Sequence, residues 1–174
     1  YLAESVAQVD RLAAMVNDVL RSGSVAEQAL RQEKRLRIDK LIAEVVDDYT
    51  LLAKTRGMTF TVDTEPTTIR ANRDMMRHVI SNLVSNAVRH GDAGSVITIT
   101  CSQHELAIKN ACKPLTKQQL RHVFDPFYRS NAATKQHADS SGIGLYTVKM
   151  LLDAKGLDYD FTPHRRGMRF VVRL

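Results

Sequence analysis

The chain has 174 residues, of which 44% are hydrophobic and 25% charged, and its formal net charge is +6 at pH 7. These values are typical of one globular domain with a short appendage, and they exclude a disordered or low-complexity chain. No apolar run reaches the length that a bilayer requires, which excludes a membrane-spanning segment.

The excess of positive charge does not indicate nucleic acid binding. The basic residues are dispersed, and their densest cluster, residues 31–37, is interrupted by Glu33 and contains no aromatic residue. A phosphate site and an acidic protein partner explain the charge as well, so we expect no nucleic acid partner. Cys101 and Cys112 lack the spacing of metal ligands or of a disulfide framework, which favours reduced thiols in the cytoplasm.

The N-terminal third of the chain predicts two helices joined by a charged linker. Residues 1–20 repeat apolar side chains at helical spacing, and a glycine between two serines, residues 22–24, ends the pattern. The stripe is broad enough for packing in a helical bundle, although packing on the same domain explains it equally. Residues 25–37 are expected to be the linker, and residues 38–49 an amphipathic helix. Tyr1 in place of Met indicates a piece of a longer protein.

The remainder alternates strand and helix patterns. We expect strands at residues 58–63, 68–71, 95–101 and 105–110, helices at 73–90, 116–124 and 145–154, and a closing hairpin of 157–162 with 168–174. Residues 131–140 are small, polar and without period, which predicts a mobile loop.

The helix at residues 73–90 combines an apolar stripe with an unusual polar one. Asn82, Asn86 and His90 recur every four residues, and Arg89 lies beside them. Asparagine is a mediocre helix former, but its amide oxygen suits Mg²⁺, which often shares its coordination sphere with phosphates. Arg89 adds a planar donor for a phosphate oxygen. One such Asn would be read as part of a solvated face; the whole set predicts a nucleotide site.

Two further blocks complete a pattern. Ser141-Gly142-Ile143-Gly144-Leu145 opens a helix, whose free N–H groups and positive dipole end attract anions. Between the two helices stands Phe124-Asp125-Pro126-Phe127-Tyr128-Arg129. A glycine pair alone is a weak signal, but three blocks in this order and spacing are specific. They resemble the N box, F box and second glycine box of the catalytic domain of two-component sensor histidine kinases.

The resemblance implies an α+β fold, a two-layer α/β sandwich of the histidine kinase/Hsp90-like ATPase type with helices on one face of a mixed sheet. It divides the chain into part of a dimerisation and phosphoacceptor helix (1–24), a linker (25–37) and an ATP-binding domain (38–174). An N-terminal helix therefore precedes the sandwich.

The resemblance also implies roles for individual residues, with ATP and Mg²⁺ as cofactors. Asn86 would bind Mg²⁺. Asn82 and Arg89 would face the phosphates as catalytic residues, and His90 would flank the base and sugar. The remaining residues implied in nucleotide binding are Asn110, Cys112, Arg129, Lys135, Gly142, Ile143, Gly144 and Leu145. For Lys135, an ordinary solvated lysine is a strong alternative.

One block departs from the family pattern. Fourteen residues before Phe124, where the family has Asp-x-Gly-x-Gly, this chain has Asn110, Cys112 and Pro114 at the three fixed places. Asparagine would replace the aspartate that reads adenine. This change motivates an alternative function, a degenerate nucleotide-binding or regulatory module with little kinase activity.

The activity implied is transfer of the ATP γ-phosphoryl to a histidine. None of His78, His90, His104, His122, His137 and His164 has the sequence context of the family's acceptor. We therefore expect the acceptor on a helix outside this chain, in a homodimer, with onward transfer to a response regulator. The chain would be the cytoplasmic part of a membrane-anchored sensor. A less favoured alternative is an ATPase of the wider fold group, in which a Glu activates water where this chain has Asn82.

Overall fold

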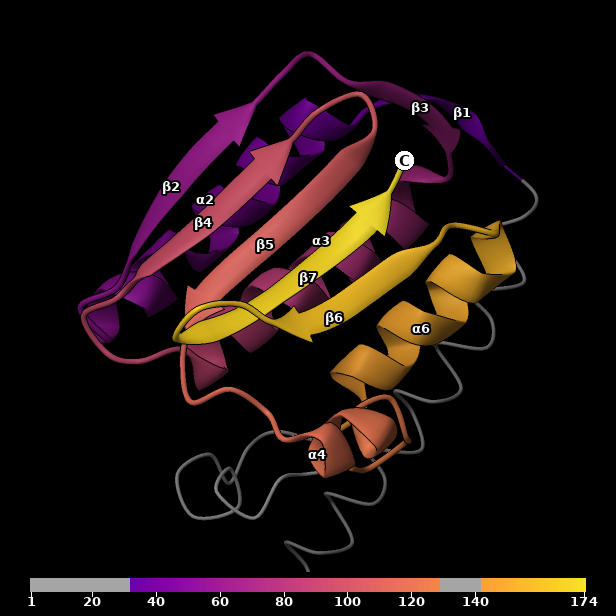
Figure 1. Ribbon diagram of the computed structural model, residues 1–174. Coiled ribbons are helices and arrows are strands. Elements are labelled where there is room, and N and C mark those ends of the chain that lie inside the picture. Colours follow the sequence, from indigo (N-terminus) through magenta and orange to yellow (C-terminus); the bar gives the residue numbers. More distant parts are fainter. Residues whose placement is uncertain (1–31, 129–141) are drawn as a thin grey trace, which may run out of the picture.

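A computed structural model describes residues 32–128 and 142–174 of the chain (Figure 1). Its elements in chain order are β1 (Lys34–Arg37), α2 (Ile38–Thr55), β2 (Thr59–Thr64), β3 (Thr68–Ala71), α3 (Arg73–His90), β4 (Val96–Cys101), β5 (Glu105–Ala111), α4 (Lys117–His122), α6 (Gly144–Lys155), β6 (Tyr159–Pro163) and β7 (Gly167–Arg173).

The main sheet is mixed, with the strand order β2-β4-β5-β7-β6. β2 runs parallel to β4, and the other neighbouring strands pair antiparallel. A parallel pair requires a long crossover, which β3 and α3 provide between β2 and β4. β1 and β3 form a separate antiparallel pair, in which Leu36 lies opposite Ile69.

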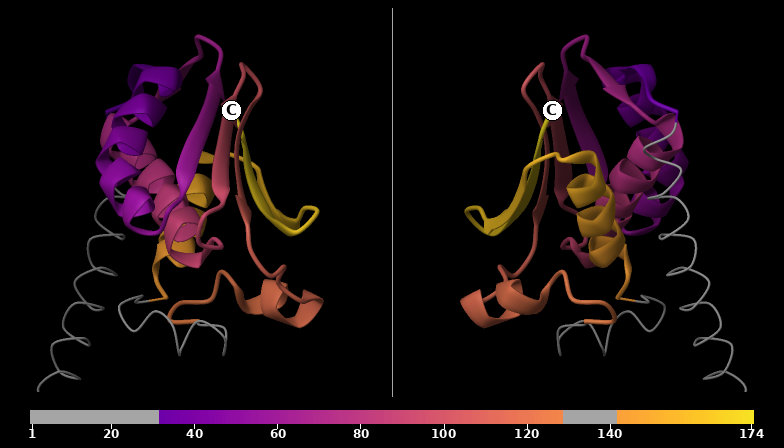
Figure 2. Two further views of the ribbon diagram at one scale, coloured as in Figure 1. Left: turned by 90° about the vertical axis from the view of Figure 1, so that its left-hand side faces the viewer. Right: turned by 90° about the vertical axis from the view of Figure 1, so that its right-hand side faces the viewer.

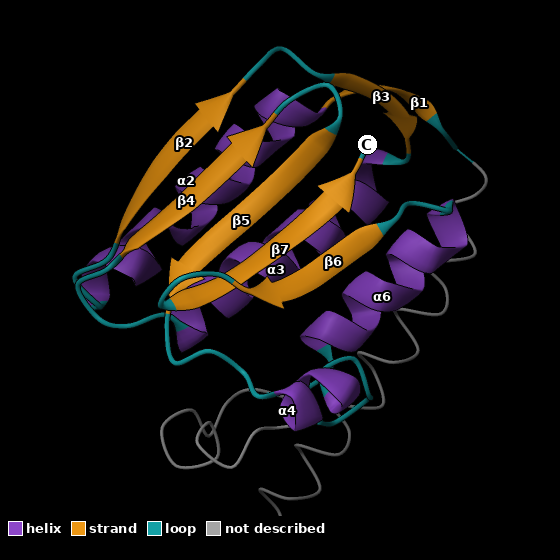
Figure 3. Ribbon diagram, in the orientation of Figure 1, coloured by secondary structure: helices purple, strands orange, loops and turns teal. Residues whose placement is uncertain are grey.

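Helices α2, α3 and α6 cover one face of the main sheet (Figures 2 and 3). α3 contacts α2 on one side and α6 on the other. Alternate residues of the central strands, such as Leu106 and Ile108 of β5, point into this layer and are buried. Burying each such side chain stabilises the fold by about 1.5–3 kcal/mol. The predicted two-layer α/β sandwich is confirmed for the described residues.

Local signals fix the ends of the helices around the site. The side chain of Asn72 accepts a hydrogen bond of 3.1 Å from the backbone N–H of Met75 and caps the start of α3. Thr116 and Gln119 form a reciprocal capping box at the start of α4. Gly156 ends α6 with φ of 72°, a left-handed conformation that glycine adopts without steric cost.

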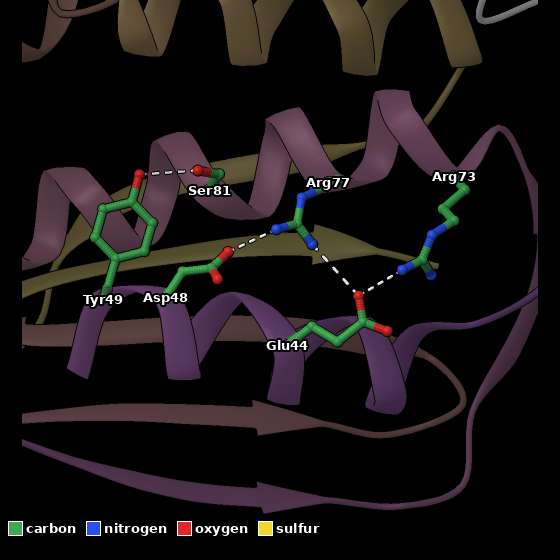
Figure 4. A network of polar contacts seen from close by, with 6 residues as sticks. All are labelled: Glu44, Asp48, Tyr49, Arg73, Arg77 and Ser81. Atoms are coloured by element: carbon green, nitrogen blue, oxygen red, sulfur yellow. Dashed lines mark hydrogen bonds and ion pairs between the residues drawn. The ribbon is translucent and has the colours of Figure 1, made fainter. Parts of the chain in front are cut away.

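A row of polar contacts joins the outer sides of α2 and α3 (Figure 4). Arg77 contacts Asp48 at 2.6 Å and Glu44 at 3.3 Å, and Arg73 also pairs with Glu44. One turn further along, the hydroxyl groups of Tyr49 and Ser81 lie 2.9 Å apart. These contacts align the two helices side by side along the first half of α3.

Two boundaries differ from the prediction. The last four residues of the expected linker form β1, whose strongly charged sequence hides the single buried side chain of Leu36. The folded domain therefore includes residues 34–37, which the prediction assigned to the linker. Helix α2 continues to Thr55 instead of ending near residue 49, because Ala53 prolongs the buried face beyond the exposed Leu51 and Leu52.

The predicted helix at residues 1–20 and the predicted loop at residues 131–140 lie outside the described residues. Within residues 32–128 and 142–174, no helix is both long enough and apolar enough to cross a membrane.

Candidate nucleotide site

Helix α3 carries the polar stripe predicted from its sequence. Leu83, Val84, Ala87 and Val88 are buried against the sheet and the neighbouring helices. Asn82, Asn86 and His90 stand one turn apart on an adjacent side and are half-buried. The apolar face thus fixes the rotation of the helix, and this rotation presents the two amides and the imidazole at the rim of the core.

The start of α6 lies directly beside this stripe. A Cβ atom added to Gly144 would lie 3.3 Å from Oδ1 of Asn82, tighter than most such contacts. α6 packs along α3 through the buried Val148, Leu151 and Leu152. The free N–H groups at the start of α6 therefore lie next to the polar face of α3, where an anion would be stabilised.

Gly142 fixes the approach to α6. It has φ of 72°, and its carbonyl oxygen accepts a hydrogen bond of 3.1 Å from the N–H of Phe127. A Cβ atom on Gly142 would lie only 2.9 Å from the Tyr128 carbonyl oxygen, so both the φ angle and the contact demand glycine. The predicted F box and second glycine box are thus held together by their backbones.

Aromatic packing anchors the F box to the sheet. The ring of Phe124 makes edge contacts with Tyr159, Phe161 and Phe170 at centroid distances of 5.5, 6.4 and 6.3 Å. Phe127, in contrast, is 48% exposed. Phe124 is therefore a packing anchor of the F box.

The end of β5 forms the side of the site predicted to hold the base. Asn110 pairs with Met168 of β7, and its side chain lies on the helix-facing side that also carries Ile108. The backbone N–H of Asp92, just after α3, donates a hydrogen bond of 2.8 Å to the Ala111 carbonyl. This bond joins the end of the helix that carries His90 to the end of the strand that carries Asn110.

Cys112 continues the same edge. Burial raises the pKa of its thiol, and the neighbouring side chain of Asn110 opposes that shift. The amide of Asn110 carries both an acceptor oxygen and donor N–H groups at this edge of the site.

Two predicted residues need a narrower interpretation. Ile143 is buried and Leu145 packs against the core, so both side chains are structural, and any contact with a ligand would come from their backbone.

The Nε atom of Arg89 donates a hydrogen bond of 3.2 Å to Ser85, one turn back on α3. Arg129 and Lys135 lie outside the described residues.

A side chain that the sequence did not single out holds the end of α3. Arg56, which follows α2, donates from Nη1 to the carbonyl oxygens of Val88 and Arg89, the latter at 2.7 Å. Its Nη2 donates to the Gly91 carbonyl at 2.9 Å. No local sequence signal could have indicated these contacts, because they join residues more than thirty positions apart.

A separate hollow of about 160 Å³ lies at the opposite end of the sheet. Its lining residues are Asp63, Glu65, Thr100, Cys101, Ser102 and Glu105. Three carboxylates would repel a phosphate, so this hollow does not suit a nucleotide. In the part of the chain that the structure describes, no three His, Cys, Asp or Glu side chains are grouped so as to hold a metal ion.

Comparison with known proteins identifies the family. Residues 71–174 match the family described as "Histidine kinase-, DNA gyrase B-, and HSP90-like ATPase", and this range contains the described parts of the site. The chain belongs to this family. The resemblance seen in the three motif blocks is thereby confirmed.

Curated relatives are sensor histidine kinases. The sensor histidine protein kinase HK06 of Streptococcus pneumoniae serotype 2 is 33% identical over 175 residues, which cover 100% of this chain and 39% of HK06. The sensor histidine kinase CusS of Escherichia coli K12 is 30% identical over 178 residues, which cover 99% of this chain and 37% of CusS. The chain therefore spans less than half the length of these relatives.

Solved structures share the fold of this ATPase-family domain. The histidine kinase AdeS of Acinetobacter baumannii has a TM-score of 0.74 at 19% identity, covering 99% of this chain and 82% of AdeS. The catalytic domain of histidine kinase ThkA has a TM-score of 0.72 at 19% identity, covering 82% of this chain and 95% of that domain. Full-length ShkA in complex with AMPPNP has a TM-score of 0.73 at 21% identity, covering 94% of this chain and 35% of ShkA.

Proposed function

We propose that this domain binds Mg²⁺–ATP between α3 and the start of α6 and transfers its γ-phosphoryl to a histidine outside this chain. The observation that carries the proposal is the close approach of Asn82 to Gly144, where an added Cβ atom would lie 3.3 Å from Asn82 Oδ1; it sets a stripe of polar side chains against a helix N-terminus. The names of the relatives HK06 and CusS support the reaction. The ATP analogue AMPPNP named with ShkA supports the ligand.

The donor set of the site fits Mg²⁺ together with a nucleotide. Asn86 offers a neutral amide oxygen, and Mg²⁺ typically takes one or two protein ligands and completes its sphere with phosphates and water. When bound, the ion would neutralise charge on the phosphates. The absence of a ready carboxylate cluster among the described residues is compatible with such a shared site.

The other side chains would position the nucleotide. Asn110 would accept a hydrogen bond from the adenine amino group, and His90 would lie against the base and sugar. Asn82 and Arg89 would face the phosphates, for which Arg89 must exchange its bond to Ser85 for one to a phosphate oxygen. Phosphoryl transfer depends mainly on such positioning and on charge stabilisation.

The acceptor and partners follow from the resemblance. We infer an acceptor histidine on a dimerisation helix outside this chain, a homodimeric full-length protein, and a response regulator as the next acceptor. From the same resemblance we infer a cytoplasmic domain of a membrane-anchored sensor.

The test is calorimetry of ADP with and without Mg²⁺. We expect Asn86→Ala to lower Mg²⁺–ADP affinity at least about tenfold, because a methyl group cannot replace the metal-binding oxygen. Asn86→Asp keeps an oxygen at this place and is the matched control, which should retain metal-dependent binding. Equal affinity of Asn86→Ala and the wild type would refute the metal assignment.

Hydrolysis of ATP is the second candidate function, since the family also contains DNA gyrase B-like and HSP90-like ATPases. Asn82 stands where those enzymes are expected to carry a Glu, and an amide cannot act as a general base. Phosphate release well above the uncatalysed rate, in the absence of an acceptor helix, would favour this function over transfer.

A further inference from the structure

The C-terminal end of α3 lacks the left-handed backbone cap with which many helices end. Gly91 follows the helix with φ of −69° and ψ of 154°, an extended conformation, and its N–H bonds only to the Ala87 carbonyl. A left-handed glycine would have supplied further backbone donors to the last carbonyl oxygens. Gly91 is also tightly enclosed, because an added Cβ atom would lie 2.6 Å from both Ala87 O and Met58 Cε.

Arg56 provides the missing donors. Its guanidinium donates hydrogen bonds to the carbonyl oxygens of Val88, Arg89 and Gly91. The last turn of α3 is thus bound to the residue that follows α2. The positive charge also suits the negative end of the helix dipole. A planar fork with donors on two sides can bind several carbonyls at once, which a lysine cannot do in the same way.

The turn that Arg56 binds is the one that carries two of the proposed nucleotide contacts, Arg89 and His90. The carbonyl of Arg89 itself accepts a bond from Arg56, and His90 follows it directly. Beyond Gly91, the Asp92 N–H bonds to Ala111 beside Asn110. Arg56 therefore lies at one end of a continuous series of contacts that sets the last turn of α3 relative to the end of β5.

We propose that Arg56 is a positioning residue of the nucleotide site, which acts through Arg89 and His90 without touching the nucleotide. This inference rests on the proposed function. It predicts that loss of Arg56 lets the last turn of α3 fray, so that Arg89 and His90 no longer meet the phosphates and the sugar at a fixed place.

The matched control is Arg77. It also joins α3 to α2, through Asp48 and Glu44, but it does so three turns before Arg89 (Figure 4). We expect Arg56→Ala to weaken Mg²⁺–ADP binding about tenfold and Arg56→Lys by less, under conditions where denaturant unfolding shows each variant to be folded. Arg77→Ala should leave the affinity unchanged within about twofold.

Two further measurements separate positioning from mere stabilisation. If Arg56 acts largely through Arg89, the double variant Arg56→Ala/Arg89→Ala should bind about as weakly as Arg89→Ala alone, whereas independent effects would multiply. Hydrogen exchange of the amides at residues 88–92, without nucleotide, should accelerate in Arg56→Ala and not in Arg77→Ala.

The outcomes are distinct. Failure of the wild type to bind adenine nucleotide would refute the proposed function itself. Binding by the wild type, together with unchanged affinity in Arg56→Ala, would overturn this inference alone. If Arg56→Ala does not fold, Arg56→Lys decides, because an affinity equal to that of the wild type would show that the bonds to the three carbonyl oxygens are dispensable.

Discussion

At the scale of single residues, Asn110 is the most informative departure from the family pattern. It lies at the end of β5 on the helix-facing side, where the resemblance places the residue that recognises adenine. With its amide oxygen turned toward the base, Asn110 can accept a hydrogen bond from the adenine amino group. Guanine presents an acceptor at the corresponding position and would not match. The aspartate of the family would accept the same bond as an anion.

We expect Asn110→Asp to tighten ADP binding, because a charge-assisted hydrogen bond exceeds a neutral one by on the order of 1 kcal/mol, or about five- to tenfold in affinity. Asn110→Ala should reduce the preference for ADP over GDP. Both are measured by titration with the two nucleotides. If Asn110→Asp does not raise the affinity for ADP, and Asn110→Ala keeps the preference for ADP over GDP, then Asn110 does not contact the base and only caps the turn at the end of the strand.

Cys112 is the second residue that departs from the family motif, and its environment makes it a weak nucleophile. Burial raises the pKa of its thiol, so little thiolate exists at neutral pH. We expect iodoacetamide to alkylate Cys112 more slowly at pH 7 than it alkylates a free cysteine. The measurement is mass spectrometry over time, with Cys112→Ser as the control for reaction at the buried Cys101. Alkylation as fast as that of free cysteine would contradict this assignment.

At the scale of the elements, Asp39 joins three of them. Arg37 at the end of β1 donates to its carboxylate at 2.6 and 2.8 Å, and the backbone N–H of Thr67, before β3, donates at 3.2 Å. The Arg37 guanidinium is the main cause that lowers the pKa of Asp39 to about 2, from an ordinary value of 3.8. The start of α2 is thereby tied to the β1–β3 pair.

This shift predicts a pH-dependent contribution to the free energy of unfolding. Because the folded pKa is the lower one, the stabilisation is present above about pH 4 and is lost as the pH falls towards 2. We expect Asp39→Asn to destabilise the domain at pH 7 by on the order of 1–2 kcal/mol, a value reduced for the half-exposed Arg37. The difference from the wild type, measured by urea unfolding, should shrink on acidification. Asp47→Asn, on the exposed face of α2, is the control. An equal loss of stability in Asp47→Asn would refute the assignment of this stabilisation to Asp39.

Elements with strong local signals were predictable from the sequence. Helix α3 begins and ends where its sequence pattern predicted, at residues 73 and 90, and the structure adds the Asn72 cap at its start. Strand β1 was not, since one buried leucine among three basic residues gives no strand pattern and only pairing with β3 orders it. The same limit applies to the site: motif blocks indicated Asn82 and Gly144, whereas Arg56 acts through contacts distant in sequence.

At the scale of the whole molecule, the proposed reaction has a consequence for this chain alone. Its histidines lack the context of an acceptor, so we expect no acid-labile phosphate on the chain after incubation with radiolabelled Mg²⁺–ATP. A separately added acceptor helical domain should be labelled slowly, because the high effective concentration of a tethered acceptor is missing. Acid-labile label on the isolated chain would contradict the assignment of the acceptor to another segment.

The backbone hydrogen bond between Phe127 and Gly142 has a consequence for how sequences of this kind can diverge. It fixes both ends of the intervening segment to the folded body. The chain entropy lost in closing a segment grows only with the logarithm of its length, so a doubling costs only about 0.6 kcal/mol. Insertions and deletions between these two anchors should therefore be tolerated far better than any change of Gly142 itself. Selection can then vary the length of this segment while the anchors stay constant.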